Sequence, residues 1–175
     1  MSKRIAKELA DCTTSPPAGI SIALPSDSDL HKWHVTLTPP PTSLYAGGTF
    51  GLIVTLPPDF PFRAPHIVFS TRVYHPNVTN DAAGNICLGL LKDENWKPGS
   101  RLRGVLEAIR ALLDEPNPDD PLEPRIADEY RRERDVFEKN ARAHVVSYAK
   151  GKPSFVEQAP APAKDGGAAG KGGKA

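Results

Sequence analysis

The spacing of apolar residues changes along the chain from a period of two to a period near 3.6, and this change constrains the fold most. Between residues 20 and 69 apolar and polar side chains alternate, as in Trp33, Val35 and Leu37. This alternation buries one face of each strand, and the Pro- and Gly-rich breaks between the runs are typical of turns. We predict a four-stranded antiparallel meander with ISIAL and HIVFS as its outer strands.

Helical spacing precedes the predicted sheet and also follows it. Near the N-terminus, Ile5, Leu9 and Cys12 behind a possible Ser2 cap predict a short amphipathic helix with a basic side. After the sheet, Ser100 can cap a helix that lies across it. The apolar stripe of that central helix is Leu102, Val105, Leu106, Ile109, Leu112 and Leu113.

Two further helical patterns complete the predicted order of elements. One lies around Ile126 and Tyr130, and the other opens at Asp135 with Glu138 three residues on. The second pattern buries Phe137, Ala141, Val145 and Tyr148. One helix, four strands and three more helices predict an α+β fold.

Composition places this fold in a single domain followed by a tail. With 175 residues, 39% of them hydrophobic, the chain suits one globular domain, residues 1–150. From Gly151 onward it consists largely of Gly, Ala, Pro and Lys with almost nothing to bury. We expect residues 151–175 to be disordered.

Charge and cysteine usage narrow the class of protein. The net charge of +1 gives no indication of nucleic acid or an anionic membrane as partner. Without a signal peptide or a long apolar run, we expect a soluble cytoplasmic or nuclear protein whose thiols, Cys12 and Cys87, are free. The histidines and cysteines lack zinc-ligand spacing, so no metal or cofactor is expected.

Cys87 lies in a polar, glycine-rich segment, VYHPNVTNDAAGNICLGLLKDENWKP, unlike Cys12 on its helical stripe. A small hydrophobe closing a loop is one interpretation of Cys87. The other is a working thiol, for which Asn77 could donate to an oxyanion. Neither His75, upstream in the segment, nor His144, in a helical pattern, is placed as its base. Cys87 therefore fits a carrier thiol without a base of its own.

Several motifs in order resemble the catalytic core of ubiquitin-conjugating enzymes over roughly Met1 to Lys150: KRIAKELADC, YAGGTF, DFPFRAP, HPNV, GNICLGLLKDENWKP and LLDEPNPDDPL. The resemblance implies the ubiquitin-conjugating fold. It also implies that the chain takes ubiquitin, or a ubiquitin-like modifier, from an activating enzyme as a thioester and passes it to a substrate lysine, usually with a ligase. A modifier other than ubiquitin and a non-catalytic ubiquitin-binding scaffold are the alternatives.

The resemblance implies a role for each residue of the site. Cys87 forms the thioester, and Asn77 either stabilises the oxyanion or braces the active-site loop. Asp120 is the carboxylate that faces the thioester, although in PDDP it could equally cap the following helix. His75 and Pro76 give the loop its structure.

The resemblance also implies a surface for the ligase and the activating enzyme. Phe62 and Pro98 would be its apolar anchors, and Lys3, Arg4 and Lys7 of the first helix its basic side. The alternative is that Phe62 tucks under its loop and the charges form an ordinary solvated face.

Two departures from the family pattern bear on the acceptor. Gly89 stands where lysine-modifying members often carry an acid, and the loop KDENWKP is one residue longer than theirs, as in a branch that hands its cargo mainly to ligase cysteines. NPDDPL is intact, however, and Asp93 or Glu94 could replace the missing acid. We therefore expect transfer to lysine, with Asp120 orienting the amine and accepting its proton.

Overall fold

Four antiparallel strands form one sheet in chain order, which confirms the predicted meander. The computed structural model describes residues 3–156. Its strands are β1 (Ile20–Ala23), β2 (Lys32–Leu37), β3 (Phe50–Thr55) and β4 (His66–Phe69). In the register, Val35 pairs with Leu52, and Leu52 pairs with Phe69. These residues therefore lie on the same face of the sheet, as their period of two requires.

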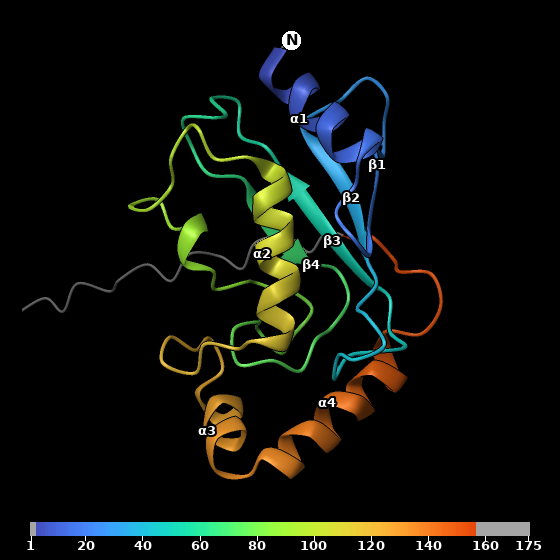
Figure 1. The fold of residues 1–175 in the computed structure, drawn as a ribbon, viewed down its shortest axis with the longest axis vertical. Helices are drawn as coiled ribbons and strands as arrows, with labels where there is room; N and C mark the ends of the chain where they lie inside the picture. The colour runs from blue at the N-terminus through green and yellow to red at the C-terminus, as the bar shows by residue number, and fades with distance from the viewer. Residues whose placement is uncertain (1–2, 157–175) are drawn as a thin grey trace, which may run out of the picture.

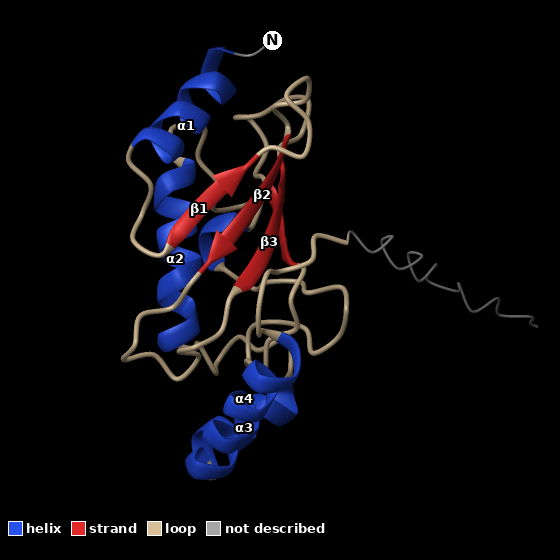
Figure 2. Cartoon of the chain, turned by 90° about the vertical axis from the view of Figure 1, so that its right-hand side faces the viewer, coloured by secondary structure: helices blue, strands red, loops and turns tan. Residues whose placement is uncertain are grey.

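The helices cover one face of this sheet and extend beyond one of its ends. They are α1 (Lys3–Thr14), α2 (Leu102–Asp114), α3 (Pro124–Arg132) and α4 (Arg134–Tyr148). Figure 2 shows α1 and α2 on the same side of the sheet, with α3 and α4 packed together past its end. The order of elements is easiest to follow in Figure 1. The α+β class predicted from the sequence is confirmed.

The core lies between the sheet and α2. Trp33, Val35 and Leu52 of the sheet are fully buried, as is Ile109 of α2. Burial of each such side chain contributes about 1.5–3 kcal/mol, so the alternating strands and the helical stripe stabilise each other. This packing positions the loops at the sheet ends that carry the candidate site.

Three details of the helices differ from the sequence-based expectation. Ser100 does not cap α2, because the helix begins at Leu102 and a carboxylate from α1 caps it instead. The last predicted helix, α4, starts at Arg134 rather than at a cap on Asp135. Tyr148 is not buried but 47% exposed, since it lies in the last turn of α4. The expected Ser2 cap lies outside the described residues.

The first residues past the predicted domain boundary lie against the sheet. The Phe155 ring stacks on His34 of β2, with centroids 4.3 Å apart and planes inclined by 6°. A Cβ on Gly51 of β3 would lie 3.0 Å from Phe155 and 3.1 Å from Pro153, so glycine leaves the room that this segment occupies. Residues 151–156 lie on the side of the sheet away from α2 (Figure 2). The remainder of the expected tail lies outside the described residues.

Candidate active site

The loop that carries Cys87 is held by backbone contacts and not by a strand or a long helix. A β-bridge pairs Val78 with Ile86, and the Cys87 N–H donates to the Asn77 carbonyl at 2.8 Å. Gly84, at φ +60°, is required in this loop, since a Cβ there would lie 1.9 Å from the Phe69 carbonyl oxygen. The loop thus presents Cys87 half-exposed, directly beside Asn77.

Cys87 shares one carboxylate oxygen with a lysine. Its Sγ lies 3.3 Å from Oδ2 of Asp120, to which the thiol donates. The Lys92 ammonium donates to the same oxygen at 2.6 Å. Lys92 follows the short 3-10 helix Gly89–Leu91, which returns the chain toward Asp120.

The charges of Asp120 and Lys92 shift the pKa of Cys87 in opposite directions. Partial burial raises the pKa of Cys87, the hydrogen bond and charge of Asp120 raise it further, and Lys92 lowers it. The hydrogen bond from Lys92 holds the pKa of Asp120 below its usual range. Cys87 therefore stays a thiol at neutral pH.

The Asn77 side chain braces the loop that carries Asp120. It is 0% exposed, and its Nδ2 donates to the carbonyls of Asn117 (2.8 Å) and Asp120 (3.0 Å). Its Oδ1 accepts from the Asn117 N–H at 2.8 Å. Both amide protons are in use, so this geometry supports the bracing role over the oxyanion role.

His75 and Pro76 connect the active-site loop to α2 and to the start of α3. Nε2 of the buried His75 donates to the Leu112 carbonyl at 2.7 Å, and its Nδ1 accepts from the Asn77 N–H at 2.9 Å. Burial lowers the pKa of His75 to about 4, so the ring is neutral and fully engaged. The Pro76 carbonyl accepts from Leu122 and Glu123, just before α3. His75 is therefore not placed to act as a base.

Of the two other carboxylates considered for the acceptor site, neither Asp93 nor Glu94 contacts Cys87 within residues 3–156. Both are exposed in the loop after the 3-10 helix. Gly89 has no atom within 4 Å of the position of a Cβ, so the missing acid leaves open space there. Asp120 is thus the carboxylate that the structure places at the thiol.

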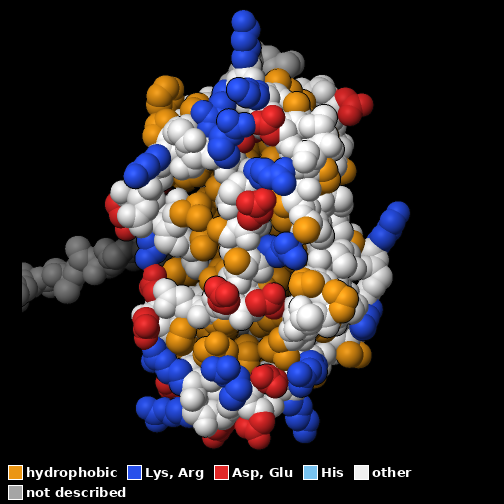
Figure 3. All heavy atoms as spheres, in the orientation of Figure 1, with side chains coloured by type: hydrophobic (Ala, Val, Ile, Leu, Met, Phe, Trp, Pro, Cys, Tyr) orange, Lys and Arg blue, Asp and Glu red, His pale blue; other side chains and the backbone are white. Residues whose placement is uncertain are grey.

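The structure also brings together the residues predicted to form the partner surface. Phe62 is 76% exposed, which excludes the alternative that it tucks under its loop. The Trp96 Nε1–H donates to the Pro61 carbonyl at 2.7 Å and joins the loop of Phe62 to the exposed loop of Pro98. Lys and Arg side chains gather at the α1 end of the molecule (Figure 3). We call the exposed Lys3, Lys7, Phe62 and Pro98 the α1-end surface.

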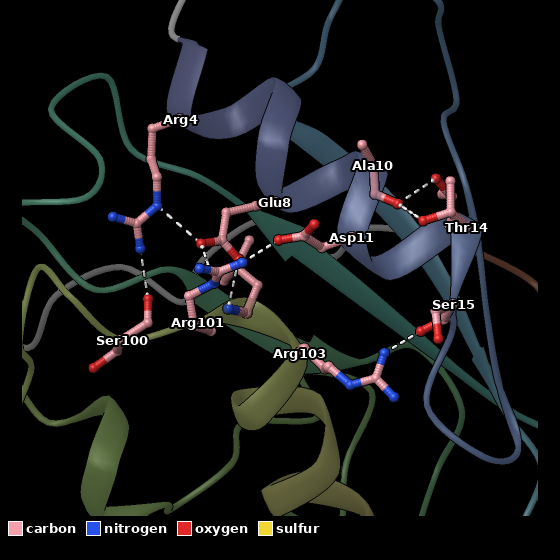
Figure 4. A network of polar contacts seen from close by, with 11 residues as sticks. Arg4, Glu8, Ala10, Asp11, Thr14, Ser15, Ser100, Arg101 and Arg103 are labelled. Carbon is pink, nitrogen blue, oxygen red and sulfur yellow. Dashed lines mark hydrogen bonds and ion pairs between the residues drawn. The ribbon is translucent and has the colours of Figure 1, made fainter.

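Arg4, expected on that surface, points inward to a buried carboxylate. Glu8 is 1% exposed; its Oε2 accepts from the Leu102 N–H at 2.9 Å and its Oε1 from Arg4 Nε at 2.8 Å (Figure 4). Arg4 also donates to the carbonyls of Pro98 (3.0 Å) and Ser100 (2.8 Å). Glu8 therefore caps α2 from another helix, and Arg4 ties α1 to the Pro98 loop.

Three residues with a part in the site were missed by the sequence analysis: Lys92, Asn117 and Glu8. Lys92 had a usable signal, because a cation shortly after the thiol is a possible thiolate partner. Asn117 and Glu8 had none, since their partners lie far away in sequence. Cys12 behaves as expected: it is buried in the core, and burial raises its pKa to about 11.

The chain is similar to known ubiquitin-conjugating enzymes over nearly the whole described region. A sequence model of the family described as ubiquitin-conjugating enzyme matches residues 4–145. The chain is 46% identical over 149 residues to ubiquitin-conjugating enzyme E2 14 of Schizosaccharomyces pombe, covering 85% of this chain and 94% of that protein. The chain belongs to the ubiquitin-conjugating enzyme family, as its motifs indicated.

Within residues 3–156, no group of three or more His, Cys, Asp or Glu side chains is arranged to hold a metal ion. No helix in the same region is long and apolar enough to cross a membrane.

Proposed function

We propose that the chain accepts ubiquitin from an activating enzyme as a thioester on Cys87 and passes it to a substrate lysine, usually with a ligase. The observation that supports this proposal is the half-exposed Cys87 thiol, 3.3 Å from the Asp120 carboxylate. A loop-closing hydrophobe would have no need of a carboxylate partner.

Loading is an exchange of one thioester for another. The Cys87 sulfur attacks the thioester carbonyl on the activating enzyme, a new C–S bond forms, and the activating enzyme leaves as its thiolate. Because the pKa of Cys87 is raised, its proton must pass to solvent as the sulfur attacks. The rate of loading should therefore rise with pH as the thiolate fraction increases.

In discharge to lysine, Asp120 acts as the proton acceptor. The amine attacks the thioester carbonyl, the C–N bond forms, and Cys87 leaves as a thiolate while the amine loses a proton. Lys92 donates to Oδ2 of Asp120, the oxygen nearest the sulfur. An acceptor lysine that binds there displaces Lys92 and can pass its proton to the carboxylate.

Asp120→Ala tests this step. We expect discharge of the thioester to free lysine to slow by about 10²-fold, the lower range for a general acid–base group, while discharge to free cysteine changes little. Loading should not slow, because losing Asp120 lowers the pKa of Cys87. The assay follows the thioester on non-reducing gels after the activating enzyme is removed.

Asp119→Ala is the matched control, since its exposed carboxylate is adjacent in sequence but pairs with Arg131. It should discharge like the wild type. Lysine discharge that is equal in the Asp120 and Asp119 variants would show that Asp120 only shapes the turn. Loss of the wild-type thioester to free cysteine but not to free lysine would show that the acceptor is a ligase cysteine.

The identity of the modifier requires its own experiment. Loading with a panel of activating enzymes, each with its own modifier, separates ubiquitin from ubiquitin-like proteins. We expect loading with ubiquitin. No loading with any member of the panel would favour a non-catalytic ubiquitin-binding scaffold.

Phe62→Ala tests the α1-end surface. A large apolar side chain that is 76% exposed is a typical anchor for a partner, so we expect ligase-stimulated discharge to fall by about tenfold or more with unassisted discharge unchanged. Val146→Ala is the control, because Val146 is also exposed, at 67%, but lies on α4. Equal stimulation of both variants would remove Phe62 from the ligase surface.

A further inference from the structure

A cavity lies where the chain leaves α4 and meets the end of the sheet. Its volume is about 310 Å³, within the range of small-ligand pockets. Its walls come from Thr49, from residues 70–72 after β4, and from the segment between Tyr148 and Ser154. No residue of the candidate active site lines it.

The lining of this cavity is strongly basic. Arg72, Lys150 and Lys152 contribute to it, and no Asp or Glu among the described residues does. None of these three cations forms an ion pair with a carboxylate within residues 3–156. The cavity therefore concentrates positive charge without compensation, although the net charge of the whole chain is only +1.

Two of the cations are held in place by neutral groups. The Arg72 guanidinium lies over the Tyr148 ring, 5.3 Å from its centroid, and Nη1 is 3.5 Å from the Tyr148 hydroxyl. Lys150 Nζ donates to the Gly47 carbonyl at 3.0 Å and keeps further protons to donate. Lys152 is exposed and makes no contact of this kind within the described region.

Neutral donors complete the lining. The hydroxyls of Thr49 and Ser154 lie at the cavity and make no hydrogen bond within residues 3–156. An arginine fork, two ammonium groups and free hydroxyls suit a tetrahedral oxyanion with several acceptor oxygens. A phosphate monoester, with nearly two negative charges at neutral pH, matches both the charge and the number of donors.

The wall contributed by the C-terminal segment is fixed by its contacts with the sheet. Phe155 stacks on His34, and Pro153 packs over Gly51. These contacts set the position of Lys152 and Ser154 beside Arg72. We propose that this cavity, the Arg72 pocket, binds a phosphate dianion, the chemistry that a phosphate monoester and free phosphate share.

The test is titration of the full chain with inorganic phosphate at constant ionic strength, followed by amide NMR shifts. We expect saturable shifts at residues 70–72 and 150–154. Lys152→Gln should weaken binding by about threefold or more, and Arg72→Gln together with Lys152→Gln by more than about tenfold. Lys139→Gln, which removes an exposed cation from α4, should bind phosphate like the wild type.

A second titration distinguishes the sources of the phosphate group. A phosphoserine peptide that binds more tightly than inorganic phosphate, with its unphosphorylated form silent, would assign the pocket to a phosphorylated protein; equal binding would assign it to free phosphate. Shifts that chloride reproduces, or that persist in the double variant, would overturn the proposal. Lys152 makes no hydrogen bond or ion pair within residues 3–156, so its variant should keep the fold.

Discussion

Asn77→Ala will lower the melting temperature and slow lysine discharge together. The variant removes a fully buried amide and leaves the Asn117 N–H and two carbonyls without their partners. Loss of such a group costs about 2–3 kcal/mol, which corresponds to a decrease of about 5–10 °C in a domain of this size. Discharge to lysine should slow by about 10²-fold, because the loop that carries Asp120 loses its brace.

A double-mutant cycle with Asp120→Ala separates bracing from oxyanion stabilisation. If Asn77 acts by positioning Asp120, the double variant should discharge to lysine about as slowly as Asp120→Ala alone. An oxyanion donor would instead cost about 10²- to 10³-fold in either background. Full additivity of the two substitutions, with an unchanged melting temperature for Asn77→Ala, would contradict the bracing role.

Glu8→Ala is expected to destabilise the protein by about 3 kcal/mol, because it removes a buried charge with three partners. The Leu102 N–H loses its cap, and Arg4 and Arg101 lose their carboxylate. We expect the melting temperature to fall by about 6–12 °C in a calorimetric scan. Loading at Cys87 should persist below the transition, since Glu8 lies outside the active-site loop.

Two variants refine the assignment for Glu8. Glu8→Gln keeps an acceptor for Leu102 but removes the charge, so it should be intermediate in stability. Asp11→Ala removes another carboxylate that pairs with Arg101, at a more exposed position, and should cost less than about 1 kcal/mol. A loss as large for Asp11 as for Glu8 would show that surface charge, and not the buried cap, stabilises the α1–α2 contact.

The sequence predicts those parts of the fold that depend on local periodicity. Alternation around Trp33 and the stripe through Ile109 were sufficient for the sheet and the central helix, because burial of one face dictates each period. Local pattern did not predict the cap of α2. Ser100 was the nearest candidate in the sequence, whereas the actual acceptor, Glu8, reaches Leu102 only after the chain has folded.

The candidate site also has a part that the sequence predicts and a part that it does not. Cys87, Asn77 and Asp120 could be named from motifs, and the structure brings all three together. The partners of the Asn77 amide could not be predicted, because two loops distant in sequence must meet before those hydrogen bonds exist. Phe155 was assigned to a disordered tail, since composition alone gives no indication that one aromatic ring will stack on His34.

The most direct test of the account is loading of the purified chain with activating enzyme, ATP and ubiquitin, resolved with and without reducing agent. The wild type and Cys12→Ala should each form a single adduct that reducing agent removes, because Cys12 is buried in the core with a pKa near 11. Cys87→Ala should form none, and Cys87→Ser should form an oxygen ester that survives the reducing agent. A reducible adduct that persists in Cys87→Ala and disappears in Cys12→Ala would contradict the central claim.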